Sequence, residues 1–110
     1  MMLLDENAGG GVQADVNAKD NQNQTPLHSS IFSGDIEITK CLIERFAELN
    51  AQDDQGKTPL HFACMLGNLS MVKLLLGRPE CIVDSQDNNG DTPLHMACSS
   101  LNDPIIRFLL

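Results

Sequence analysis

Apolar residues gather in short blocks along the chain, and stretches of polar, turn-forming residues separate these blocks. The block at residues 69–76 is nearly all apolar, and a helix of that kind must be buried between neighbouring elements. Similar blocks at about residues 36–46 and 104–110 predict further helices of the same set. The polar stretches at residues 53–57 and 87–91 predict turns that project into solvent.

A repeated tetrapeptide marks the start of a second set of helices. Its copies are Thr25-Pro26-Leu27-His28, Thr58-Pro59-Leu60-His61 and Thr92-Pro93-Leu94-His95, at offsets of 33 (58 − 25) and 34 (92 − 58) residues. Threonine is a good N-cap, and proline is favoured in the first helical position because its missing N–H would have no partner there. Gly34 and Gly67 each follow their threonine by nine residues and suit the left-handed turn that ends a helix.

The flanks of the tetrapeptide repeat as well, since residues 15–20, 48–53 and 82–87 align with one another. Together these motifs resemble the ankyrin repeat, with its 33-residue period and Thr-Pro-Leu-His-x-Ala signature. The resemblance implies an all-α solenoid of stacked helix-turn-helix units with projecting β-turn or hairpin loops. It also implies the following division: an N-terminal tail or remnant of a preceding degenerate repeat at 1–14, and repeats at 15–47, 48–81 and 82–110, the last incomplete at its C-terminus.

Three positions depart from the family pattern. Phe46 and Leu101 stand where a glycine-like, left-handed backbone is usual, and bulky side chains resist that conformation. We expect Asn102 to take over the left-handed turn in the third repeat. Asn23 replaces the turn glycine found at the equivalent places of the other repeats, and asparagine tolerates that geometry.

The charge balance narrows the classes of partner. Seven basic and fifteen acidic residues give a formal charge of −8, which argues against nucleic acid and anionic membranes and leaves a basic or apolar protein surface as the expected partner. No apolar run reaches the roughly 20 residues of a membrane span, and the start lacks a signal peptide. We therefore expect a cytoplasmic protein, without excluding the nucleus, with reduced thiols. Because the third repeat stops inside its second helix, we expect this chain to be part of a longer one.

Candidate chemistry is sparse. His61-x-x-Cys64 and His95-x-x-Cys98 have ligand types at helical spacing, but Ile31 occupies the cysteine position in the first repeat. We therefore interpret Cys64 and Cys98 as buried packing residues and expect no metal and no cofactor. Gly9-Gly10-Gly11 lacks the Lys-Ser/Thr of a phosphate-binding loop, and the acidic pairs fall in turns, so we expect no catalytic site.

The resemblance places a binding face on the turn tips and the first helix of each repeat. The residues expected to contact a partner there are Phe32, Met65, Leu66, Asp54, Gln55, Lys57, Asn88, Asn89, Asp91 and Ser99. Gln22 and Gln24 are further variable positions of the same face. Phe32, Met65 and Leu66 form either an exposed apolar patch or a packing contact between adjacent repeats, and we favour the exposed patch.

The leading interpretation is a protein–protein interaction module without enzymatic activity, and the alternative is a regulatory or targeting segment of a larger enzyme or channel. A free-standing metal-binding protein is a third hypothesis, which metal analysis decides. The spacing of Leu42 and Asn50 is also similar to the pattern that asparaginyl hydroxylases recognise in ankyrin repeats. Asn50 is therefore either a modification site or a structural turn residue that bonds nearby backbone.

Overall fold

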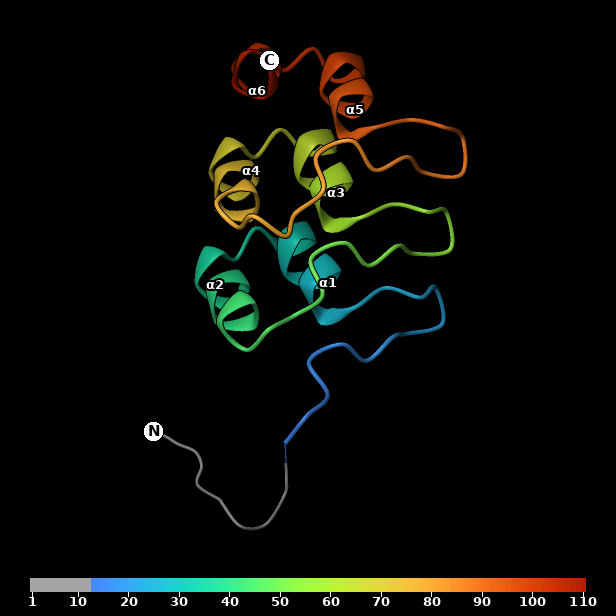
Figure 1. The fold of residues 1–110 in the computed structure, drawn as a ribbon, viewed down its shortest axis with the longest axis vertical. Helices are drawn as coiled ribbons and strands as arrows, with labels where there is room; N and C mark the ends of the chain where they lie inside the picture. Colours follow the sequence, from blue (N-terminus) through green and yellow to red (C-terminus); the bar gives the residue numbers. More distant parts are fainter. Residues whose placement is uncertain (1–12) are drawn as a thin grey trace.

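Within the described part of the chain, six helices form two layers (Figure 1). The computed structural model describes residues 13–110, and no strand occurs in that part of the chain. In chain order the helices are α1 Pro26–Ser33, α2 Ile36–Glu44, α3 Pro59–Met65, α4 Leu69–Leu76, α5 Pro93–Ser99 and α6 Asp103–Leu109. Helices α1, α3 and α5 stack as an inner layer and α2, α4 and α6 as an outer layer, so the predicted all-α stack of helix pairs is confirmed. The predicted tail at 1–14 lies almost wholly outside the described residues.

Each inner helix begins with the same reciprocal cap, which explains the repeated tetrapeptide. At α3 the Thr58 hydroxyl accepts the backbone N–H of His61, and the His61 ring Nδ1 accepts the backbone N–H of Thr58 at 3.0 Å. Two donors that a helix start would leave without partners are satisfied in this way. The caps at Thr25 and Thr92 have the same form.

Left-handed backbone closes the inner helices and one outer helix. Gly34 and Gly67 have φ values of 73° and 72°, as predicted, and the bulky Phe46 and Leu101 also adopt it, with φ values of 65° and 57°. The expectation for Asn102 is wrong. Its φ is −88°, because Asn102 is the N-cap of α6 and its side chain accepts the backbone N–H of Ile105. An N-cap needs a non-helical backbone of negative φ, so the left-handed turn falls to Leu101.

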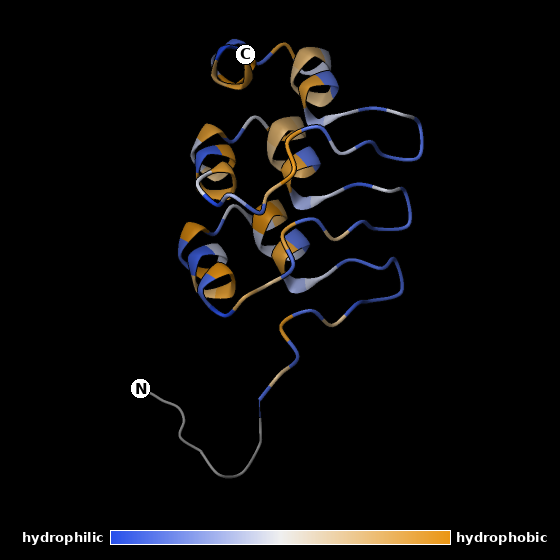
Figure 2. Ribbon diagram, in the orientation of Figure 1, coloured by the Kyte–Doolittle hydropathy of each residue, from blue (hydrophilic) through white to orange (hydrophobic). Residues whose placement is uncertain are grey.

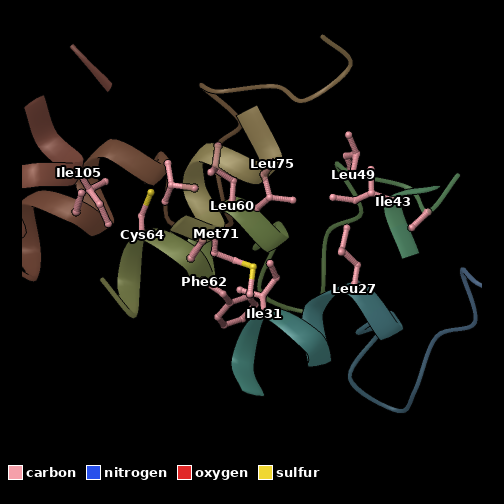
Figure 3. Close-up of a cluster of buried hydrophobic side chains, with 14 residues drawn as sticks. Leu27, Ile31, Ile43, Leu49, Leu60, Phe62, Cys64, Met71, Leu75 and Ile105 are labelled. Carbon is pink, nitrogen blue, oxygen red and sulfur yellow. The ribbon is translucent and has the colours of Figure 1, made fainter. Parts of the chain in front are cut away.

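The core lies between the two layers and runs the length of the stack (Figure 3). Its fully buried members include Leu27, Ile31, Leu60, Cys64, Met71, Val72, Leu75 and Ile105. The apolar helix α4 contacts both α2 and α6, as its composition predicts. Figure 2 shows the hydrophobic residues on the helices and the hydrophilic residues in the projecting loops.

Three loops of equal form project beside the inner helices; we call them hairpin 1 (residues 20–24), hairpin 2 (residues 53–57) and hairpin 3 (residues 87–91) (Figure 1). The first and last residue of each are joined by a backbone hydrogen bond, at 3.0, 2.9 and 2.8 Å in chain order. Neighbouring hairpins are joined too: the Asp54 N–H donates to the Gln22 carbonyl, and the Asn88 N–H donates to the Gln55 carbonyl. The hairpins therefore form a continuous edge along the stack.

Candidate binding face

The inner helices and the hairpins together form one face of the molecule, which we call the inner face. Equivalent positions of α1, α3 and α5 there carry Phe32, Met65 and Ser99, and the first two side chains are 51% and 37% exposed. Leu66, beside Met65, is 48% exposed. Phe32 also packs against Phe62 of α3, with 4.8 Å between ring centroids. Phe32 thus both joins two repeats and presents apolar surface to solvent.

A hollow of about 330 Å³ lies between hairpins 1 and 2. It is bounded by Gln22 and Gln24 of hairpin 1, by Asp53, Asp54 and Gln55 of hairpin 2, and by the two rings Phe32 and Phe62. We call it the aromatic hollow. Among the described residues that line it, the charged side chains are the carboxylates of Asp53 and Asp54.

The carboxylates of the hairpins have two different functions. The Asp53 Oδ1 atom accepts the backbone N–H groups of Gln55 and Lys57, each at 2.9 Å, and so folds hairpin 2 from within. Asp87 does the same for hairpin 3. Asp54 is exposed in the turn and accepts the side-chain amide of Asn23.

Lys57 and Asp91 are less accessible to a partner protein than the sequence predicts. The Lys57 ammonium lies 3.1 Å from the Oδ2 atom of Asp87, and both side chains are largely withdrawn from solvent. Burial alone would raise the pKa of Asp87, but hydrogen bonds from Asp91, Lys57 and Asn89 outweigh it and lower that pKa. Asp91 follows the turn of hairpin 3, is half-buried, and accepts a hydrogen bond through its carbonyl. Its expected place at the turn tip is therefore wrong.

The remaining predicted contact residues lie along the same edge. Gln55, Asn88 and Asn89 are exposed, and the Asn88 amide donates to the Asp54 carbonyl at 2.9 Å. Ser99 is exposed on α5.

Two of the signature histidines connect one repeat to the next. The ring Nε2 of His28 lies 3.0 Å from the Lys57 carbonyl, and that of His61 lies 2.8 Å from the Asp91 carbonyl. Since Nδ1 accepts from the threonine backbone, Nε2 carries the proton and donates. Desolvation by burial lowers the pKa of His28, although the Lys57 carbonyl and nearby carboxylates act in the opposite sense. The neutral ring is the form that these hydrogen bonds require.

The cysteines follow the packing interpretation only in part. Cys64 is fully buried, and burial, followed by the nearby Cys81, raises the pKa of its thiol to about 12. Cys98, by contrast, is exposed, so its expected burial is wrong. None of the described residues covers the side of α5 on which it lies. Among residues 13–110 no three histidine, cysteine, aspartate or glutamate side chains are placed together to hold a metal ion.

One family model, described as ankyrin repeats in three copies, matches residues 1–83 and again residues 34–110. The chain belongs to the ankyrin repeat family. Ankyrin repeats are in general protein–protein interaction modules and are typically non-catalytic. No curated protein matches the chain significantly. None of the helices that the structure describes is long and apolar enough to cross a membrane.

Asn50 lies where two ankyrin repeats meet. Its side-chain amide donates to the Glu80 carbonyl at 2.9 Å, and its side-chain oxygen accepts the backbone N–H of Ile82 at 2.8 Å. Both polar ends of the side chain are therefore engaged, as the structural interpretation of this asparagine requires. Hydroxylation of Asn50 stays a prediction.

Sequence reasoning missed how neighbouring ankyrin repeats pair their polar side chains. It assigned Lys57 to a partner, whereas the structure pairs Lys57 with Asp87. It also gave no function to Phe62, whose ring lies against Phe32. A comparison of the residues that precede the signature threonines would have indicated the contact of Lys57 with Asp87. The residue before the threonine faces the aspartate that begins the next hairpin, as Lys57 faces Asp87.

Proposed function

We propose that this chain is an adaptor or scaffold module that binds a partner protein through the inner face. The observation that carries the proposal is the exposure of Phe32, Met65 and Leu66 beside an acidic and amide-rich hairpin edge. Aromatic residues and methionine are enriched in protein interfaces, and a few buried anchors supply most of the binding energy. The formal charge of −8 supports a partner whose contact surface is basic around an apolar centre.

We place this interaction in the cytoplasm, with the nucleus not excluded. The free state of Cys41, Cys64, Cys81 and Cys98 supports a reducing compartment.

The test is quantitative capture of partners with the full chain and two matched double variants. Met65→Ser with Leu66→Ser removes apolar surface from the inner face. Ile82→Ser with Val83→Ser removes a similar amount elsewhere, since these side chains are 53% and 39% exposed in the loop after α4. With a purified captured partner, we expect the inner-face variant to lose about 2 kcal/mol or more of binding free energy, mainly through faster dissociation.

The loop variant should bind as the wild type does, and all variants must keep the wild-type helical circular dichroism. A third variant, Asp54→Asn, should slow association and reduce its dependence on salt, because an exposed rim charge steers encounter. Wild-type affinity of the inner-face variant would refute the proposed function.

A further inference from the structure

The aromatic hollow between hairpins 1 and 2 has a shape and a charge that fit one kind of side chain. We propose that it receives an arginine of the partner protein, with the guanidinium against the Phe32 ring and its N–H groups toward the carboxylates of Asp53 and Asp54. This inference rests on the proposed function and names the partner chemistry of part of the inner face.

The space between hairpins 2 and 3 contains a cation that the aromatic hollow, between hairpins 1 and 2, lacks. Between hairpins 2 and 3, the carboxylate of Asp87 meets the ammonium of Lys57 at 3.1 Å. Between hairpins 1 and 2 the equivalent carboxylate is Asp53, and the residue equivalent to Lys57 is Gln24. The Gln24 amide reaches the Oδ2 atom of Asp53 at 3.3 Å but carries no charge. One gap thus has its cation built in, and the other has a carboxylate whose counter-charge is missing.

The second carboxylate adds to this imbalance. Asp54 is exposed at the rim, and its contact in the structure is the neutral amide of Asn23. Lys57 does not neutralise the hollow, because its ammonium is held by Asp87. A cation that entered here would meet two carboxylates, and none of the described residues that line the hollow is a lysine or an arginine.

The aromatic rings distinguish arginine from other cations. Phe32 is half-exposed, and the centroids of its ring and the Phe62 ring lie 4.8 Å apart at the boundary of the hollow. At the equivalent positions of the next gap stand Met65 and Met96, which have no ring. A planar guanidinium stacks on an aromatic face and presents a fork of donors to carboxylates, whereas an ammonium is a compact, strongly hydrated charge. The volume of about 330 Å³ is at the lower end of ligand sites and suits one side chain rather than a folded element.

The experiment is a titration of the isotopically labelled full chain with a capped Gly-Arg-Gly peptide at millimolar concentrations, followed through backbone amide signals by NMR. The matched probe contains citrulline, which keeps the length and planarity of arginine without its charge. We expect the arginine peptide to shift the amide signals around Gln24, Asp53 and Asp54 in a saturable way. The citrulline peptide should bind at least about tenfold more weakly.

Two variants and a control locate the site. Gln24→Lys should place an ammonium on Asp53 as Lys57 does on Asp87, and should weaken binding of the arginine peptide at least about tenfold. Gln86→Lys adds the same charge at an exposed position outside the hollow and should leave binding within about twofold of the wild type. Phe32→Leu removes the ring alone and should also weaken binding.

Equal binding of the citrulline peptide, or undiminished binding to the Gln24→Lys variant, would overturn the inference. Either result is independent of the proposed function, which is measured with the captured partner and the Met65, Leu66 variant. If that variant loses its partner while the arginine peptide fails to bind, the inner face binds proteins without an arginine in this hollow.

Discussion

Replacing Phe46 by glycine should stabilise the protein, although it removes a large aromatic side chain. Phe46 follows α2 with a φ of 65° and is 89% exposed. A left-handed backbone costs a bulky residue about 1–2 kcal/mol, and glycine adopts it without that cost. The ring has little burial to lose: about a tenth of the roughly 3 kcal/mol for a fully buried phenylalanine, or about 0.3 kcal/mol. The greater freedom of glycine in the unfolded chain subtracts about 0.5–1 kcal/mol.

The sum is a gain of about 0.5 kcal/mol in the free energy of unfolding for Phe46→Gly. Urea unfolding followed by circular dichroism measures it; at a slope of about 1–2 kcal/mol per M, the midpoint should rise by about 0.3–0.5 M. Phe32→Gly is the matched control, because Phe32 lies within α1 and is half-buried. That change should lower stability by about 2 kcal/mol through lost burial and poor helix propensity. A lower midpoint for Phe46→Gly than for the wild type would refute the reasoning from backbone strain.

Three further outcomes are expected. His61→Ala should lower stability by about 2–3 kcal/mol, because it removes a fully buried ring and leaves the buried N–H of Thr58 without its partner, although the Asp91 carbonyl keeps the hydrogen bond from the Asp87 N–H. His95→Ala should cost less than about 1 kcal/mol, since His95 is exposed, and urea unfolding of both variants checks this difference. Stability should fall as the pH drops below about 6.5, because the pKa of His28 is lowered in the folded protein and the unfolded chain therefore binds a proton that the folded protein does not. His28→Gln should reduce this pH dependence in melting curves recorded at several pH values. In the native protein a thiol reagent should modify Cys98 rapidly and Cys64 only on unfolding. Cys98 is exposed, whereas Cys64 is buried and its thiol has a pKa of about 12. Mass spectrometry of the labelled peptides measures the two rates.

The helices could be predicted from the sequence because their signals are local. Thr58 and Pro59 determine where α3 begins, and the apolar block of 69–76 coincides with the bounds of α4. Asn102 was placed wrongly because two roles compete there: the same residue type suits a left-handed turn and an N-cap. The structure uses Asn102 as the cap and places Leu101 in the turn.

The candidate site could be predicted only as a set of positions. Exposure of Phe32, Met65 and Leu66 follows from the inner-helix register, which the repeat spacing reveals. The contact between Lys57 and Asp87 joins residues 30 positions apart in different hairpins, and no periodicity within one repeat encodes it. The exposure of Cys98 was missed because an averaged repeat treats every copy as flanked on both sides.

The histidine hydrogen bonds between repeats end on the backbone carbonyls of Lys57 and Asp91. These bonds between repeats therefore do not depend on the side chains that a partner would meet. Every residue type supplies that carbonyl, so the side chain before each signature threonine can change without loss of the link. The three repeats carry glutamine, lysine and aspartate at this place, which are neutral, positive and negative. Natural or designed substitutions can therefore change the charges along the hairpin edge, one repeat at a time, while the histidine hydrogen bonds between the repeats are kept.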